Sequence, residues 1–551
     1  MKRLSNGEIA ANLLALAQHL KVRGENKFKI KAYRKAAQTI ESLGESIDEA
    51  VRAEQNLTVY PGIGNAISGV IRDLVLTGSI PQLRALQSEA PPQIIEIAQY
   101  PRLDPSRVIR VYKKLGIASI EELKQKLAEG EVAAKLGVRM DQHVRQALSE
   151  SRDMLLYHAE KHVPGVQSFL INQCGVCRAE PTGAYRRRVE VVDEISFLIL
   201  TENFPAASEQ ISRYGGGQTE VVSATDTERV WRLSSGIKLR IKTSTPDRWG
   251  SDLVLSTGSA AHLSQLKTRG AIDAASSEAA VYSHLGLPLI PPELREGHDE
   301  IALAETDNLP RQILTGDIRG ELHAHSTSSD GVNTIEEMAA AARDFGYEYI
   351  GISDHSQSLK IAGGLPETTL WEQIRFIDKL NEKLEGVRVL KSAEVDILVD
   401  GSLDYPDELL RELDYTVCSI HSRFGLGKAD QTERVLRAMD NKYFHILGHA
   451  TGRLLLKRPG YELDIDRVLE HARQRGCFFE INSSPDRLDL STENARLARQ
   501  AGIKIAINTD AHSTHDFNYL RFGVDQARRA GFSRESILNA YSWPALRQLL
   551  Q

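Results

Sequence analysis

The chain has few cysteines, no long apolar run and no low-complexity tract. Only four cysteines occur among its 551 residues, which excludes a fold held together by a disulfide framework. No apolar stretch approaches the ~20 residues that a membrane-spanning helix requires. Residues 1–8 lack the apolar core and the cleavage site of a signal peptide. We therefore expect a cytoplasmic protein that does not contact a membrane.

The composition is that of an ordinary globular protein. Hydrophobic residues make up 41% of the chain and charged residues 26%, and the length allows three or more domains. The net charge of −6 conceals a basic segment near the N-terminus. Between Lys21 and Lys35, seven Lys or Arg residues accompany a single Glu.

The basic segment belongs to a region with a helical pattern. Apolar residues such as Ile9 and Leu13 recur at helical spacing, so we expect helices over residues 6–43. Basic residues alternate there with Phe28 and Tyr33, which suits a surface that binds nucleic-acid phosphates; a solvated helix face is the alternative. The candidates for DNA contact are Lys27, Lys31, Arg34 and Lys35.

A G-x-G turn at Gly62 and Gly64 lies between two helical segments. Such a turn exposes consecutive backbone N–H groups at the start of a helix, which suits a DNA phosphate. Glycine also lets the backbone approach the ligand without a clashing Cβ. The alternative is a plain connection between two helices. Residues 100–105 and 135–139 have the pattern of degenerate copies of this turn.

Residues 321–512 form the most organised part of the sequence. Short apolar runs alternate there with helical stretches such as residues 334–345, which predicts seven buried parallel strands followed by helices. His, Asp and Glu residues stand at or just after the ends of these runs, where a βα-barrel builds its active site. They are His323, His325, Asp330, His355, Glu394, His421, His449, Asp510 and His512.

These side chains are the ligand types of a metal centre. A single H-x-H would be weak evidence, because alternation along a strand puts both imidazoles on one face whatever their purpose. So many potential ligands at successive strand ends have no ready structural explanation. A mixed set of imidazoles and carboxylates suits Zn²⁺ or Mn²⁺.

The same motifs carry a family resemblance. The H-x-H, the S-D-H at residues 353–355 and the D-A-H at residues 510–512 resemble the PHP superfamily of metal-dependent phosphoesterases, named after polymerase and histidinol phosphatase, whose fold is a distorted seven-stranded βα-barrel. The remaining sequence resembles bacterial family X DNA polymerases with such a domain. The resemblance implies an all-α helix-hairpin-helix domain (1–90), a fingers-like helical domain (91–150), an α+β palm and thumb (151–295), a linker (296–318) and an α/β PHP barrel (319–551).

The resemblance also implies roles for individual residues. It assigns a first ion to His323, His325, Glu394 and Asp510, a second to Glu394, His421 and His449, and a third to Asp330, His355 and His512. Glu394 would bridge two ions, and it and Asp510 would be catalytic. Arg423 and Arg453 are candidates to hold a phosphate, with plain surface arginines as the alternative. Up to three ions, Zn²⁺ or Mn²⁺, would activate water for phosphoester hydrolysis.

The palm-like region lacks the residues of a polymerase centre. Family polymerases hold two Mg²⁺ with an Asp-x-Asp pair and a third Asp. Here Glu194 and Ser196 stand at the pair, Lys238 stands at the third position, and Ala184 replaces a phosphate-binding Ser. An ammonium supplies no ligand and repels Mg²⁺. The alternative is that Asp193 and Glu194 still hold a metal.

Together these features predict a monomeric DNA-repair protein with an active PHP domain. By resemblance its reaction is 3′→5′ exonuclease action, with abasic-site or 3′-end processing as an addition, on gapped, nicked or 3′-ended DNA. The polymerase centre is expected to be inactive. Three alternatives remain open: a family X polymerase with retained gap filling, a small-molecule phosphatase of the histidinol-phosphate kind, and a DNA-binding scaffold without activity.

Overall fold

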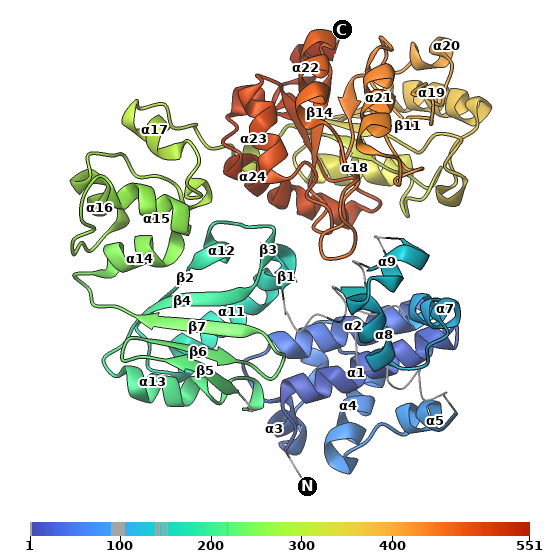
Figure 1. Cartoon of the computed structure of the whole chain (residues 1–551). Coiled ribbons are helices and arrows are strands. Elements are labelled where there is room, and N and C mark those ends of the chain that lie inside the picture. Colours follow the sequence, from blue (N-terminus) through green and yellow to red (C-terminus); the bar gives the residue numbers. More distant parts are fainter. Residues whose placement is uncertain are drawn as a thin grey trace. The chain divides into compact units, whose positions relative to one another are not determined.

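The computed structural model describes residues 3–89, 105–137, 140, 141, 144, 145, 148, 153–217 and 219–550. Contacts divide the chain into two compact units (Figure 1). The first is Met1–Leu289 with Leu456–Arg458, and the second is Ile290–Leu455 with Pro459–Gln551. Among the described residues, no helix is long and apolar enough to cross a membrane.

The first unit begins with a helical bundle. Its helices are α1 (Asn6–Val22), α2 (Lys27–Ser42), α3 (Ile47–Arg52), η1 (Leu57–Val59), α4 (Asn65–Thr77) and α5 (Pro81–Glu89). Ser5 and Glu8 form a capping box that starts α1. Buried residues of α1 and α2, such as Leu13 and Ile40, form a common apolar core. The prediction of helices over residues 6–43 is thereby confirmed.

A second helical group has its own small core. It contains α7 (Pro105–Leu115), α8 (Ile120–Ala128) and α9 (Glu131–Leu136), whose buried residues Val108, Leu123 and Val132 pack together. The degenerate hairpins predicted at residues 100–105 and 135–139 lie largely outside the described residues, which omit 100–104, 138 and 139.

The rest of the first unit is a mixed α/β body. Its elements are β1 (Met154–Leu155), α11 (Leu156–Gln173), β2 (Arg178–Pro181), α12 (Gly183–Arg186), β3 (Val191–Val192), β4 (Glu194–Leu200), α13 (Phe204–Ile211), η2 (Tyr214–Gly216), β5 (Glu220–Ala224), β6 (Glu228–Arg232), β7 (Lys238–Thr243), α14 (Trp249–Thr257), α15 (Ala260–Lys267) and α16 (Glu278–His284). The main sheet has the order β2-β4-β7-β6-β5. Its central pair, β4 and β7, is parallel, and the other neighbours are antiparallel. This pairing sets which side chains of β4 and β7 face each other.

The second unit is built on parallel strands. They are β8 (Gly320–Ala324), β9 (Tyr349–Ile352), β10 (Arg388–Lys391), β11 (Glu394–Asp396), β12 (Val417–Ser419), β13 (Ile446–Leu447), β14 (Phe478–Asn482) and β15 (Ile505–Asn508). They form two sheets, ordered β10-β9-β8 and β11-β12-β13-β14-β15. Parallel bridges from Ala324 to Ala511 and from His355 to Glu394 join the edges of the two sheets. Because only two residues separate β10 from β11, they act as one interrupted strand. Within residues 290–550, all of which are described, there are eight strands, and the predicted count of seven is obtained when β10 and β11 are counted as one.

Helices surround these strands. They are α17 (Glu300–Glu305), α18 (Ile335–Asp344), α19 (Glu367–Asn381), α20 (Asp407–Leu410), α21 (Lys428–Met439), α22 (Ile465–Arg475), α23 (Thr492–Gln500), α24 (Leu520–Arg529) and α25 (Trp543–Leu550). One apolar cluster joins strand residues such as Leu322 and Val417 to Leu546 of α25. Packing here is tight: a Cβ on Gly351 would lie 1.7 Å from the Tyr415 hydroxyl. Glycine is therefore required at this point of β9.

The segment expected to be a linker, residues 296–318, is more structured than a plain loop. It contains α17 and the short helix η4 (Thr315–Asp317). Glu296 forms an ion pair with Arg529 at 2.8 Å, and Asp299 forms one with Arg499 at 2.5 Å. The segment is thus fastened to the helices α23 and α24 of the same unit.

Candidate metal centre

The predicted ligands come together at the carboxyl ends of the barrel strands. Their burial decreases from the floor of the site to its mouth. His323 on β8 and His325 directly after it are fully buried, and Glu394 at the start of β11 is 1% exposed. The side chains of Asp330 and His512 are 34% and 37% exposed. The site therefore has a buried floor and an open rim.

Glu394 lies at the centre of the group. Its Oε1 is 2.8 Å from Nε2 of His449 and 3.2 Å from Nε2 of His421. Its Oε2 is 2.8 Å from Nδ1 of His355 and 3.5 Å from Nε2 of His323. The two oxygens of one carboxylate thus face imidazoles from different strand ends. This arrangement suits a carboxylate that bridges two cations.

The buried polar atoms of the site fit a set of metal ions. In the part of the chain that the structure describes, several of them lack a hydrogen bond of acceptable geometry: Nε2 of His323, Nδ1 of His325, His355 and His449, and both oxygens of Glu394. A buried polar atom without a partner costs free energy, so such atoms are rare in proteins. Cations bound among them would satisfy them.

Three sets of potential ligand atoms lie within 4.8 Å of one another. The sets are His325, Asp330, His355 and His512; His323, His325 and Asp510; and His355, Glu394 and His421. All nine predicted ligands lie at this centre, because His449 also contacts Glu394. The sets differ from the prediction in that His325 and His355 each belong to two of them. Which ligand holds which ion stays a prediction.

Carboxylates behind the imidazoles orient the rings. Nδ1 of His323 lies 2.7 Å from Oε1 of Glu480, and Nδ1 of His421 lies 2.6 Å from Oδ1 of Asp396. A carboxylate bonded to one ring nitrogen fixes the tautomer and aims the other nitrogen at a metal. Sequence reasoning did not assign this role to Glu480. The signal was present, since Glu480 lies in β14, the one predicted strand to which no ligand had been assigned.

Glu480 belongs to a buried polar network. Nδ2 of Asn482 donates to Oε2 of Glu480 at 3.2 Å and to Oδ2 of Asp510 at 3.1 Å. Nδ2 of Asn508 donates to Oε1 of Glu480 at 3.0 Å. Alternation along β14 places Glu480 and Asn482 on the same face of the strand. The network ties Asp510 to the same support as His323.

Charge in the centre is balanced between carboxylates and imidazoles. Burial raises the pKa of the Glu394 carboxyl, but the imidazoles of His421 and His355 hold it well below its ordinary value. Burial lowers the pKa of His355, yet Glu394 and Asp330 outweigh burial and raise it to about 10. The pKa of His421, lowered by burial, is likewise raised to about 9 by Glu394 and Asp396. Without metal, these imidazoles are protonated at neutral pH.

The two arginines proposed to hold a phosphate have different surroundings. Arg453 donates from Nε to the carbonyl oxygen of Arg487 at 3.0 Å and from Nη2 to that of Leu488. Its guanidinium therefore braces the loop after β14. Arg423 is exposed and follows His421 with a positive φ of 54°. Of the two, Arg423 is better placed to meet a substrate.

The polymerase-like centre in the first unit is occupied by an arginine. On β4, Glu194 accepts a 3.0 Å hydrogen bond from the Ser196 hydroxyl. Arg240 on β7 donates to Glu194 at 2.6 and 3.1 Å and to Glu228 at 2.5 Å. The strand register places Lys238 opposite Glu194 and Arg240 opposite Ser196. Sequence reasoning named Lys238, but Arg240, two residues later on the same face, is the cation that contacts the carboxylate.

Another arginine of this region is also paired within the protein. Arg186 of α12 makes two bonds to Glu278, of 2.8 and 2.7 Å, and one of 2.9 Å to the Thr257 hydroxyl. A paired guanidinium of this kind is a strong, geometrically fixed interaction. Ala184, on the same helix, supplies no hydroxyl for a phosphate.

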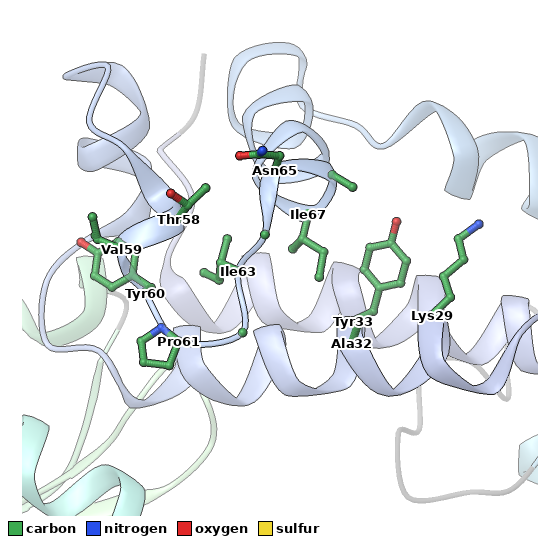
Figure 2. A pocket seen from close by; sticks show the side chains of 13 residues that line it. Lys29, Ala32, Tyr33, Thr58, Val59, Tyr60, Pro61, Ile63, Asn65 and Ile67 are labelled. Atoms are coloured by element: carbon green, nitrogen blue, oxygen red, sulfur yellow. The ribbon is translucent and has the colours of Figure 1, made fainter.

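The G-x-G turn lines an open groove of about 760 Å³ (Figure 2). Gly62 has a φ of 83°, and Gly64 is the N-cap of α4 without a side-chain cap. The first backbone N–H groups of α4 are therefore available to a ligand. Lys29 and Tyr33 of α2 line the groove beside the turn. Sequence reasoning did not single out Lys29.

The predicted basic residues of α2 have different surroundings. A Cβ on Gly62 would be 3.0 Å from Cγ of Lys35, so the Lys35 stem packs against the turn. Lys27 and Lys31 are exposed. Arg34 donates to the Gln18 side chain at 3.3 Å.

Metal binding should release protons. The pKa values of about 10 for His355 and 9 for His421 mean that both rings carry a proton at pH 7, whereas a metal ligand must be neutral. Apparent affinity for Zn²⁺ or Mn²⁺ should therefore rise with pH up to these pKa values of about 9 and about 10. The measurement is titration calorimetry of the metal-free protein in two buffers of different ionisation enthalpy.

The matched control is His471→Gln, which removes a partly buried histidine that pairs with Asp440 outside the metal centre. This variant should release as many protons as the parent protein, and His421→Gln should release fewer. Binding heats that do not depend on the buffer would contradict the assignment.

Comparisons with known proteins agree with this geometry. The family description "Helix-hairpin-helix domain" matches residues 5–80, and "PHP domain" matches residues 321–484. A probable phosphatase of Thermoanaerobacter sp. (strain X514) is 32% identical over 231 residues, which cover 40% of this chain and 89% of that protein. A probable phosphatase of Acetivibrio thermocellus is 31% identical over 35% of this chain and 78% of its own length.

One relative matches nearly the whole chain. The DNA polymerase/3′-5′ exonuclease PolX of Bacillus subtilis (strain 168) is 33% identical over 561 residues, which cover 97% of each chain. The likeness thus extends through the helical bundle, the mixed α/β body and the barrel. The chain belongs to the family of bacterial X-type DNA polymerases that carry a PHP domain.

Proposed function

We propose that this chain hydrolyses phosphodiester bonds at the 3′ ends of DNA with a multinuclear metal centre in its PHP domain. The observation that carries the proposal is the buried Glu394 carboxylate, whose two oxygens face different imidazoles at 2.8–3.5 Å. The printed name of the Bacillus subtilis relative includes a 3′-5′ exonuclease, which supports DNA as the substrate. Removal of damaged or unpaired 3′ ends during repair is the corresponding role.

The residues of the centre have distinct tasks. His323, His325, Glu394 and Asp510 would hold one ion, Glu394 with His421 and His449 a second, and Asp330, His355 and His512 a third. Up to three divalent ions, Zn²⁺ or Mn²⁺, would lower the pKa of a water molecule and stabilise the oxygens of an in-line displacement at phosphorus. Glu480 and Asp396 hold the rings of His323 and His421 in the tautomer that ligates. The buried floor excludes bulk water, and the rim admits the substrate.

DNA is held by the N-terminal domain in this proposal. The free end of α4 at Gly64 presents backbone N–H groups to a phosphate. Lys27, Lys31, Arg34 and Lys35 add positive charge around the turn. The protein acts as a cytoplasmic monomer with five parts, bounded as the sequence predicts, and its substrates are gapped, nicked or otherwise 3′-ended DNA.

In this proposal the palm-like body binds DNA but does not transfer nucleotides. Two-metal transfer needs several carboxylates that converge on Mg²⁺. The bonds from Arg240 to Glu194 and Glu228 place a fixed cation where such an ion would have to bind. This arrangement supports the prediction of an inactive polymerase centre.

Nuclease activity should depend on Glu394. Purified protein is expected to shorten the 3′ end of a labelled oligonucleotide with Mn²⁺, and Glu394→Gln should reduce the rate at least ~10²-fold, because a positioned electrostatic group typically contributes that much. Glu385→Gln, a change at an exposed glutamate of the same unit, is the matched control and should be fully active.

The same assay separates the alternatives. Full activity of Glu394→Gln would place the nuclease elsewhere. Hydrolysis of small phosphomonoesters without any action on DNA would favour the phosphatase alternative. Metal-free protein that binds DNA and cleaves neither substrate after metal addition would favour a scaffold.

Templated nucleotide addition should be absent. With the nuclease disabled by Glu394→Gln, a one-nucleotide gap should stay unfilled with Mg²⁺ or Mn²⁺. Each missing electrostatic group costs ~10²–10³ in rate, and several are missing together. Because groups that act as a unit are not additive, Arg240→Asp alone should not restore activity. Template-directed extension would show that Asp193 and Glu194 still hold metal.

DNA binding should depend on the turn. Gly62→Val with Gly64→Val should weaken binding at least tenfold, since a β-branched residue is strained at the φ of 83° found at Gly62. Lys31→Gln and Lys35→Gln should each remove one phosphate contact, which lowers the slope of log affinity against log salt concentration by about one. Gly69→Ala, where a Cβ has open space, is the control. Fluorescence anisotropy at several salt concentrations measures these effects, and unchanged affinity of the double glycine variant would place the DNA site elsewhere.

A further inference from the structure

The loop that follows β9 carries an unusually exposed apolar side chain at the metal centre. It connects His355, a predicted ligand, to α19, and the short helix η5 (Lys360–Ala362) forms its tip. Ile361 at this tip is 96% exposed, compared with 70% for Val332 on the preceding βα loop. An isolated exposed apolar residue needs no explanation in general. Ile361, however, lies on a loop that is hydrogen-bonded to residues supporting the metal ligands.

The base of the loop is rigid and fastened to the ligands. The Ser358 hydroxyl donates to Oδ2 of Asp396 at 2.5 Å, and Asp396 in turn contacts His421. The Ser358 N–H donates to Asp404 at 2.7 Å. Near the far end of the loop, Leu365 N–H donates to the His355 carbonyl oxygen at 2.8 Å. The tip is thus positioned by the same groups that position the metal ligands.

Close packing also fixes the return of the loop. A Cβ on Gly364 would lie 2.0 Å from the Ser356 carbonyl oxygen, and one on Gly363, whose φ is 71°, would lie 3.4 Å from that of Ser329. The loop therefore lies against the β8–α18 loop, which carries Asp330. Val332 on that loop donates its N–H to the His512 carbonyl oxygen at 2.8 Å. Two exposed apolar side chains thus flank the rim of the centre.

We propose that Ile361 is a wedge that separates the terminal base pair of duplex DNA, so that the 3′ nucleotide reaches the metal centre unpaired. The inference rests on the proposed nuclease function. Apolar side chains that insert beside bases unstack them, and an enzyme that acts on a paired nucleotide must meet the free-energy cost of unpairing it. A rigid loop has little conformational entropy left to lose on contact, which favours binding. The ligand of this side chain is the face of a nucleobase.

The test compares the first cleavage on three substrates: a paired 3′ end, a mismatched 3′ end and a single strand. Ile361→Ser should slow cleavage of the paired end by about tenfold, and it should change the other two rates less than about twofold, since only the paired end requires unstacking. Ile361→Met, which keeps an apolar side chain, should restore the rate on the paired end. Leu314→Ser is the control, because Leu314 is 57% exposed but precedes the first barrel strand.

A second measurement does not depend on cleavage. With the Glu394→Gln protein, a 2-aminopurine at the paired 3′ end should become brighter on binding, because unstacking relieves its quenching. Adding Ile361→Ser should abolish the increase while the affinity for single strands is kept.

The outcomes distinguish this inference from the function on which it rests. No cleavage of any DNA by the parent protein would overturn the nuclease itself. An active nuclease in which Ile361→Ser slows all three substrates equally, or none of them, would overturn only the wedge. So would an increase in 2-aminopurine fluorescence that is as large with Ile361→Ser as without it.

Discussion

The second unit is organised around one buried carboxylate and the imidazoles that surround it. Glu394 contacts one histidine inside a barrel strand, His323, and three that follow other strands, His355, His421 and His449. A buried charge is tolerated only when opposite charge compensates it, so these strand ends must converge within a few ångströms. Protons on the imidazoles can supply that compensation in the absence of metal, and metal ions can supply it when bound. The strands, the supporting Glu480 network and the loops at the rim all hold these groups at the short distances that this compensation requires.

Much of this unit could be predicted because its signals are local. Buried parallel strands are continuous apolar runs, and their ends are marked by the polar residues that follow, as at His355 and His449. Glu480 was missed because it lies inside its strand, and its partner His323 is 157 positions away in the sequence. Contacts of that range depend on how the strands pair, which no local pattern encodes.

The same limit explains the other differences. The contact between Arg240 and Glu194 follows from the pairing of β4 with β7. The sequence indicated that a basic side chain replaces the metal ligand, but not which basic residue contacts Glu194. The stretch 296–318 has the composition of a loop, yet an ion pair with Arg529, 233 positions later, helps to hold it against the barrel helices. Lys29 lines the groove at the hairpin because of the packing of α2 on the turn, a relation between segments distant in sequence.

Arg240 also changes how the palm-like body responds to its surroundings. In a polymerase the negative charge of the centre is neutralised by ions that exchange with solvent, so the shape of the site varies with the supply of magnesium. Here the neutralising charge is part of the chain and cannot be chelated, diluted or replaced by another metal. Under the proposed function, the body that bears Glu194 and Glu228 would therefore not respond to metal availability, and the metal requirement of the protein would be confined to the barrel. A protein deprived of metal would then still bind nucleic acid but would no longer cleave it.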